Sequence, residues 1–277
     1  MDATIFPTKN RSVLCMWHLI KQRNSWRQKR LLPLNQTAWP FKALNGFSLI
    51  EVAIALLLLG LLSAGLLSFL EHLKQRTYAK KTVAHQERIF RALGNFLRQN
   101  GRLPCPADPM EKKLFGHARK NCRTERDAQG LVPFRTLGLS EKIAQNGASV
   151  FFTYVVHPTI TQRPPAGPKN VHPYCRNKIQ HHAAIEILPH NKQEAQYIKD
   201  PIVVVLLNHL KTGEGSFLKG YKRRKPYVKP FRYQRQNSDD DLIFVDPSST
   251  PHNTDETLQF ETKNNLASYY AHLVCRQ

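Results

Sequence analysis

The sequence has few acidic residues and lacks the common catalytic motifs. Asp and Glu number 20 against 41 Lys and Arg, which gives a formal net charge of +21. A glycine-rich phosphate loop, a GxSxG nucleophile turn and an HExxH metal site are all absent. We therefore predict that the protein is not an enzyme. The basic excess is compatible with binding to nucleic acid or to an anionic membrane, and equally with solubility alone.

Charge and proline are also missing from one long stretch. No proline occurs from Phe47 to Leu103, and Glu51 is the only charged residue within 47–70. An apolar segment of about 20 residues is long enough for a helix that spans a bilayer. The basic residues before Phe47 favour a cytoplasmic N-terminus by the positive-inside rule. Since no small-residue cleavage site follows the apolar run, a conventional secretory signal is excluded.

Glu51 is an unusual residue for such a segment. A lone carboxylate within a membrane costs roughly 3 kcal/mol, so it usually marks a function or a partner. Cleavage after Gly46 would turn Phe47 into a free α-amine close to Glu51. The carboxylate would then pair with its own amine or with that of a neighbouring chain. Because a charge pair between chains would set their axial stagger, we expect this helix to pack with copies of itself.

The segment Gly46–Glu51 carries a resemblance to a known family. It reads GFSLIE ahead of a Leu-, Ala- and Gly-rich helix, and it resembles the type III signal of type IV pilins and type II secretion pseudopilins. The resemblance implies that a prepilin peptidase cuts after Gly46 and methylates the amine of Phe47. It also implies that Glu51 faces the N-terminus of a neighbouring pilin or pseudopilin subunit in a filament. The leader, residues 1–46, is long for this family.

The same resemblance implies a location and a role. The chain would be a single-pass protein of the bacterial inner membrane, with a cytoplasmic N-terminus and a periplasmic head in contact with membrane lipid. The filament would serve type II secretion, a type IV pilus or DNA uptake. The alternative is an uncleaved membrane protein whose periplasmic head binds a partner, with nucleic acid as one candidate.

The helical pattern continues beyond the apolar run. Apolar residues recur at steps of three and four up to Leu97, and Asn100-Gly101 is a typical helix stop. We expect Glu71–Arg88 to lie at the lipid headgroups, because it has few large apolar residues and several bases. The predicted organisation is a cleaved leader at 1–46, a transmembrane helix at 47–70, an amphipathic helix at 71–100 and a globular head at 101–277.

The head contains short apolar runs typical of strands. We predict a small helix followed by a strand at 150–156, and further strands at 183–188, 201–207, 241–246 and 272–274. The fold class is therefore α+β, with a long N-terminal helix packed on a small antiparallel sheet, as in pilins. Gln145-Asn146-Gly147 stands where pseudopilins often have an Asp-x-Trp-Gly turn, and it keeps only the glycine.

Four cysteines follow the predicted cleavage point. An even number in an exported domain suggests disulfides, and three pairings of Cys105, Cys122, Cys175 and Cys275 are possible. The short loop favours Cys105–Cys122, which would leave Cys175–Cys275. A zinc site with nearby histidines is the rival interpretation, but no CxxC spacing supports it.

Two further segments are candidate binding sites, although no cofactor is required. Clustered carboxylates at Asp239, Asp240 and Asp241 are candidate calcium ligands, and a polar turn is the alternative. The stretch 220–235 mixes bases with aromatic residues, a composition that can contact DNA phosphates and bases. The residues concerned are Lys222, Arg223, Arg224 and Arg232, and a solvated loop is the alternative.

Overall fold

The structure is a computed structural model. It describes residues 48–179, 185–189, 200–221, 224–228, 232–247 and 256–275, without the side chains of 63–68, Pro189 and Arg232. The chain divides into two compact units, residues 1–58 and 59–277. The leader and the predicted cleavage residues Gly46 and Phe47 lie outside the described residues.

One long helix begins the described chain. Helix α1 runs from Leu49 to Asn100 and has 52 residues, which confirms the single proline-free helix predicted from the sequence. It ends at Gly101, whose φ of +68° suits glycine and whose N–H donates to the carbonyl of Leu97 at 2.8 Å. Among the residues that the structure describes, no helix combines the length and the apolar character needed to cross a membrane.

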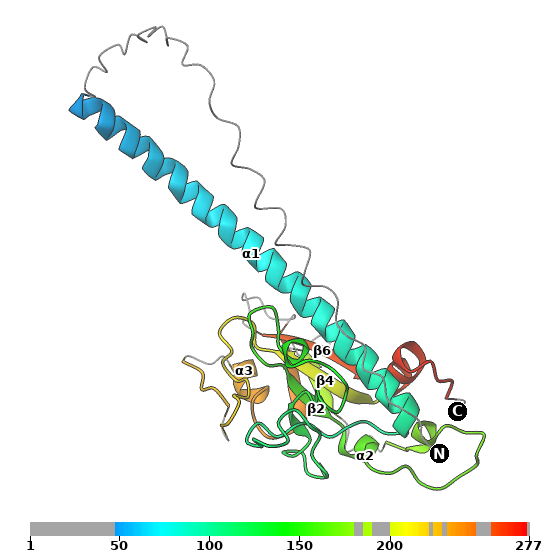
Figure 1. Ribbon diagram of the computed structural model, residues 1–277. Helices are drawn as coiled ribbons and strands as arrows, with labels where there is room; N and C mark the ends of the chain where they lie inside the picture. Colours follow the sequence, from blue (N-terminus) through cyan, green and yellow to red (C-terminus); the bar gives the residue numbers. More distant parts are fainter. Residues whose placement is uncertain are drawn as a thin grey trace, which may run out of the picture. The chain divides into compact units, whose positions relative to one another are not determined.

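The head is built on a four-stranded antiparallel sheet. Its order is β1 (Gln129–Leu131), β2 (Thr153–Val156), β4 (Ile202–Asn208) and β6 (Thr257–Thr262). All seven residues of β4 are buried, so the predicted central strand at 201–207 is confirmed. Figure 1 shows the second half of α1 alongside β4 and β6.

The two faces of this sheet are covered by different elements. Apolar residues of α1 pack on one face, among them Phe90 and Leu93, which share a core with Leu206 of β4. The other face, which includes Val205, packs against Phe244 from a second layer. This layer contains β3 (Glu186–Pro189) and β5 (Ile243–Asp246). The prediction of a long helix on an antiparallel sheet is thus confirmed for the head.

Within the described residues, short helical elements lie between the strands and after β6. They are η1 (Glu141–Ala144), α2 (Pro158–Thr161), η2 (Pro173–Arg176), α3 (Arg232–Gln236), α4 (Lys263–Asn265) and the π-helical turn η6 (Leu266–Tyr270). The first of these, η1, is the small helix expected before the strand at 150–156.

Several details of the sheet differ from the predictions. Strands β3 and β5 pair in parallel, not antiparallel. Residues 272–274 form no strand, because the N–H groups of Ala271 and Leu273 already donate to carbonyls of the preceding helical turn at Leu266 and Ala267. The strand β6, which pairs with β4, was not predicted, and neither was β1.

The middle of α1 makes contacts that the sequence did not predict. Within the stretch expected at the lipid headgroups, Thr82 and His85 contact the head instead. The Thr82 hydroxyl accepts the N–H of Gly147 at 3.0 Å, and His85 Nδ1 lies 2.6 Å from the carbonyl oxygen of Gln145. Polar residues suit this position because they satisfy backbone groups of the turn after η1.

Candidate processing and assembly site

The start of α1 positions Glu51 in the first helical turn. The N–H groups of Glu51 and Val52 both donate to the carbonyl of Ser48, at 3.0 and 3.2 Å. An acid in this position interacts favourably with the positive end of the helix dipole. The Glu51 side chain is exposed. Since Gly46 and Phe47 lie outside the described residues, the pairing of Glu51 with the Phe47 amine stays a prediction.

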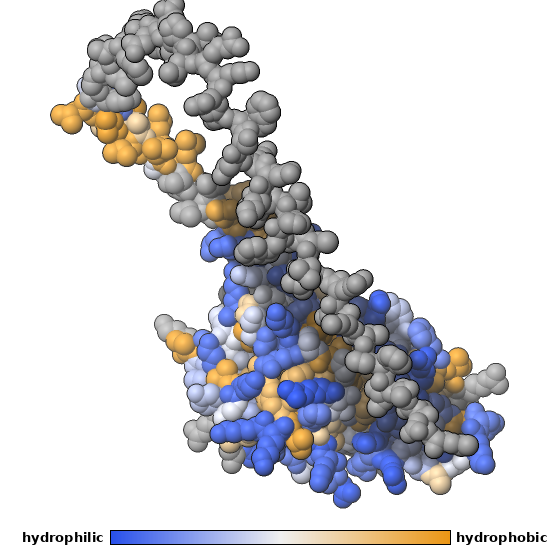
Figure 2. Space-filling view, in the orientation of Figure 1, coloured by the Kyte–Doolittle hydropathy of each residue, from blue (hydrophilic) through white to orange (hydrophobic). Residues whose placement is uncertain are grey.

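The first turns of α1 carry an uncovered apolar surface. The large apolar side chains from Leu49 to Leu62 are all exposed, from 44% for Val52 to 90% for Leu49. Figure 2 shows these hydrophobic residues together at the start of the helix. A helix that is apolar on every side is normally buried in a large core or in lipid. The apolar side chains of this part of α1 are therefore available for contact with lipid or with another chain.

The turn after η1 joins the head to α1. Asn146 accepts the N–H groups of Ala148 and Val150, at 2.9 and 3.0 Å, and donates to Asn208 Oδ1 and to the carbonyl of Leu210, both at 2.8 Å. All four bonds are made by a side chain that is itself buried. Asn146 thus takes a central part in this turn, a role that the sequence comparison with the Asp-x-Trp-Gly turn did not assign to it.

The close approach of α1 explains why residue 147 of this turn is a glycine. A Cβ at this position would lie 2.4 Å from the carbonyl oxygen of Tyr78 on α1. Real Cβ atoms do not approach so closely, so only glycine fits between the turn and the helix.

The four cysteines of the head form two disulfides. Cys105 bonds to Cys122 across 17 residues, and Cys175 bonds to Cys275 across 100 residues. This is one of the three pairings that the sequence left open, and it is the one that the short loop favoured. The second bond attaches the segment after η6 to η2.

The candidate nucleic-acid residues are only partly described. Lys222, Arg223 and the side chain of Arg232 lie outside the described residues. Arg224 is half-buried: it stacks on the ring of Phe217 at 4.3 Å and donates to the carbonyl of Gly215 at 3.3 Å. It also donates to Gln129 Oε1. Arg224 is therefore engaged within the protein, and DNA binding by this segment stays a prediction.

Two of the three aspartates, Asp239 and Asp241, meet at the Gln236 amide, and Asp240 is bonded elsewhere. Gln236 Nε2 donates to Asp239 at 3.0 Å and to Asp241 at 3.1 Å, whereas Asp240 pairs with Arg126 at 3.3 Å. Partial burial, together with the nearby Asp241 carboxylate, raises the pKa of Asp239 to about 7. Among the described residues, no group of three or more His, Cys, Asp or Glu side chains is arranged to hold a metal. The calcium site stays a prediction.

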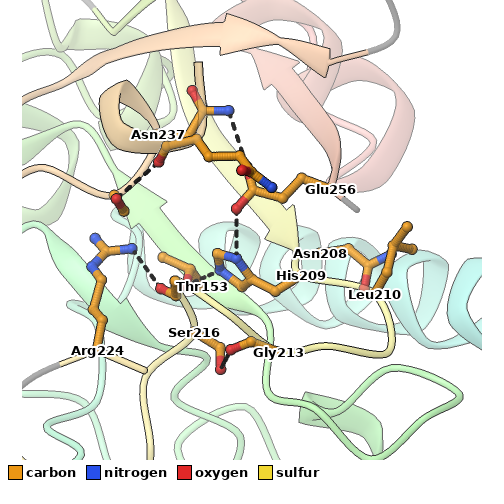
Figure 3. A network of polar contacts seen from close by, with 12 residues as sticks. Thr153, Asn208, His209, Leu210, Gly213, Ser216, Arg224, Asn237 and Glu256 are labelled. Carbon is orange, nitrogen blue, oxygen red and sulfur yellow. Dashed lines mark hydrogen bonds and ion pairs between the residues drawn. The ribbon is translucent and has the colours of Figure 1, made fainter. Parts of the chain in front are cut away.

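A buried polar cluster was not predicted from the sequence. His209 Nε2 lies 2.9 Å from the Thr153 hydroxyl, and His209 Nδ1 lies 3.0 Å from Glu256 Oε1, as Figure 3 shows. Tyr227 also donates to Glu256 Oε1, at 2.5 Å. These residues come from distant parts of the chain, so no local pattern connects them.

The cluster has the order of a hydrolase triad but not its accessibility. A hydroxyl, an imidazole and a carboxylate follow one another as they do in serine hydrolases. Thr153, His209 and Glu256 are, however, all 0% exposed. Since no substrate carbonyl can reach a fully buried hydroxyl, the cluster satisfies buried polar groups where β2 and β6 begin and β4 ends.

Comparison with known proteins identifies the beginning of the helix. Residues 42–67 match the family model of the prokaryotic N-terminal methylation motif. No curated protein and no solved structure is significantly similar to the chain. The motif implies processing by a prepilin peptidase and assembly with other pilin subunits, and it indicates a membrane-associated bacterial protein with a structural role. The chain thus carries, at residues 42–67, the cleavage and methylation motif of type IV pilins and pseudopilins.

Proposed function

We propose that the chain is a minor pilin or pseudopilin of an inner-membrane filament. Prepilin peptidase cuts between Gly46 and Phe47 and methylates the new amine. The stretch 47–70 anchors the subunit in the inner membrane, and the head lies in the periplasm. The filament serves type II secretion, a type IV pilus or DNA uptake. The observation that carries this proposal is the coincidence of the motif at 42–67 with the start of an apolar, uncovered helix.

Charge neutralisation is the role proposed for Glu51. Two opposite charges about 4 Å apart attract by about 4 kcal/mol at an effective dielectric constant of 20. This attraction is comparable with the roughly 3 kcal/mol that a lone acid costs in a membrane. Before cleavage the amine does not exist, so the pair forms only in the mature subunit. Processing thereby controls when subunits associate.

The composition of the head agrees with a periplasmic location. Disulfides persist in oxidising compartments, of which the bacterial periplasm is one. Both disulfides lie after the apolar stretch, on the side that the positive-inside rule exports.

Cleavage can be followed by tryptophan fluorescence as well as by mass. All three tryptophans, Trp17, Trp26 and Trp39, lie in the leader. When the full chain is expressed in membranes with an active prepilin peptidase, we expect a product that begins with N-methylated Phe47 and has no tryptophan emission. Without the peptidase, the leader and its emission should remain.

Two matched variants test the position of the cut. Gly46→Leu should block cleavage, because the family cuts after glycine, whereas Ala43→Leu adds a similar bulk nearby and should still be processed. An intact leader on the unmodified chain beside an active peptidase would contradict the proposal. That result would favour the alternative, an uncleaved membrane protein with a periplasmic binding head.

A further inference from the structure

A cationic cavity lies beside the disulfide that joins Cys105 to Cys122. Its volume is about 420 Å³, and four basic side chains line it: Arg102, Lys120, Arg123 and Arg163. The remaining lining residues are polar or belong to the disulfide, and no described carboxylate is among them. We call this feature the disulfide cavity.

The four bases have no acidic partner within the described residues. None of them takes part in an ion pair there. The sequence around two of these bases also lacks acids. No Asp or Glu occurs within 88–107, which contains Arg102, or within 142–185, which contains Arg163. Like charges placed around one cavity repel each other, and an anion bound between them would relieve this repulsion.

The cavity is held in shape by the surrounding structure. Arg102 Nη1 donates to the carbonyl of Thr161 at 3.1 Å, which fixes one guanidinium at the cavity wall. The disulfide ties the loop that carries Lys120 and Arg123 to the segment after α1. The Arg102 guanidinium and the backbone of the loop that carries Lys120 and Arg123 are thus held in place before any ligand binds, which lowers the entropic cost of binding.

We propose that the disulfide cavity binds a phosphate group of a soluble phosphodiester chain. Arginine suits this ligand because its planar guanidinium can donate two parallel hydrogen bonds to phosphate oxygens. No aromatic residue lines the cavity, so bases have no stacking surface. The site therefore recognises the phosphate backbone and not the base sequence.

The position of the cavity favours a soluble ligand over a lipid headgroup. Arg102 follows Leu70 by 32 residues, of which 30 are helical, and a helix rises 1.5 Å per residue, so the cavity lies roughly 45 Å along α1 from the end of the apolar stretch. Lipids of the membrane that holds the anchor are out of reach at that distance. This step rests on the proposed membrane anchorage, whereas phosphate binding itself does not.

The test compares two double variants of the full chain in an uncharged detergent. Lys120→Gln/Arg123→Gln removes two bases from the cavity, and Lys113→Gln/Arg135→Gln removes two exposed bases elsewhere. The affinity for a fluorescent single-stranded oligonucleotide is measured between 50 and 200 mM salt. Each phosphate contact with a single strand contributes about 0.7 to the slope of log K against log salt. Because the cavity variant lacks two bases, its slope should be smaller by about 1.4. The control variant should keep most of the slope.

Four further outcomes are decisive. Inorganic phosphate should weaken oligonucleotide binding more than chloride does at equal ionic strength. Equal losses in the two variants, both with unchanged thermal unfolding, would show a diffuse charge effect and overturn the proposal. So would binding to anionic vesicles without binding to the oligonucleotide, or no binding at low salt. Because the readout is the same for cleaved and uncleaved chains, failure here is distinct from failure of the proposed processing.

Discussion

Gly94 of α1 lies directly against the backbone carbonyl of Tyr270 in η6. A Cβ at Gly94 would be only 2.4 Å from that carbonyl oxygen and 2.7 Å from Tyr270 Cβ. The neighbouring ring of Phe90 lies 5.5 Å from the ring of Tyr270. The missing side chain thus lets the last turn of the head pack onto the helix.

Replacing this glycine should therefore destabilise the head. Gly94→Ala forces backbone atoms apart, and overpacking of this kind costs about 1–3 kcal/mol, against a gain of about 1 kcal/mol in helix propensity. The measurement is urea unfolding of the detergent-solubilised chain, followed by circular dichroism. Gly60→Ala is the control, because its Cβ would meet nothing within 4 Å. Equal stability of the two variants would contradict the close packing.

The Asn146 amide gives a second prediction. Asn146→Asp keeps the two acceptor contacts but puts a carboxylate oxygen opposite Asn208 Oδ1 and the carbonyl of Leu210. Loss of the donors leaves buried oxygens unpaired, so we expect a loss of about 1–3 kcal/mol in the free energy of unfolding. The same change at exposed Asn95 should have little effect. If Asn146→Asp unfolds at the wild-type urea concentration, the turn does not depend on these donors.

The two disulfides should differ in their contribution to stability. In the chain-entropy description, a bond that closes about 15 residues contributes about 3 kcal/mol and one that closes about 100 contributes about 4.7 kcal/mol. Cys175→Ser/Cys275→Ser should therefore lower the urea midpoint more than Cys105→Ser/Cys122→Ser does. The reverse order would mean that native contacts, not loop length, decide the difference.

The raised pKa of Asp239 predicts that the stability of the fold decreases between about pH 4 and 7. Its pKa is raised from 3.8 to about 7, so the folded state holds a proton that the unfolded chain releases at lower pH. The contribution of this bound proton to the free energy of unfolding is present in full below about pH 4 and is lost as the pH rises through 7. Asp239→Asn removes the penalty of ionisation, and its advantage over the wild type should grow between pH 4 and 7 and then level off.

The size of this effect is limited by solvent. Because the side chain is largely exposed, we expect at most about 1 kcal/mol. Unfolding curves at several pH values provide the measurement, with the exposed Glu125→Gln as the control. A constant difference across this range would show that Asp239 does not titrate as described.

The last prediction concerns assembly. Glu51→Gln removes the charge that we propose pairs with the Phe47 amine, and we expect at least a tenfold loss of subunit from isolated filaments. Insertion and cleavage should continue, because a neutral side chain enters lipid more easily than a carboxylate. Glu71→Gln, an exposed acid just beyond the apolar stretch, should assemble normally. Wild-type filament content in Glu51→Gln would contradict the pairing.

Local patterns in the sequence were sufficient to predict the helix α1 and the central strand β4. The absence of proline and the Asn100-Gly101 stop give the extent of α1, and the uninterrupted Val and Leu run gives β4. Strand β6 alternates apolar and polar residues instead of forming a continuous run, so a search for compact apolar segments missed it. Strand β1 has only three residues, one of them glycine, and shows no pattern at all.

Contacts between distant residues could not be predicted in this way. The parallel pairing of β3 with β5 depends on how the chain returns to the sheet, which spacing does not specify. The bond between His209 and Glu256 joins two buried polar residues that resemble ordinary surface residues in the sequence. The mixture of bases and aromatic residues around Arg224 suggested an exposed binding loop. In the structure, Arg224 is half-buried and its guanidinium stacks on the ring of Phe217.

The bond between Cys175 and Cys275 has a consequence for biosynthesis. Cys275 is made 100 residues after Cys175, and at 5–20 residues per second the ribosome needs about 5–20 s to travel from one cysteine to the other. During that interval β4 lacks one neighbour and three cysteines are already available to an oxidant. Cys105 can bond to Cys122 as soon as both are made, whereas Cys175 has no native partner until Cys275 follows. In an oxidising compartment, faithful maturation therefore requires that Cys175 stay reduced during that interval, or that an isomerase correct any bond that it forms early.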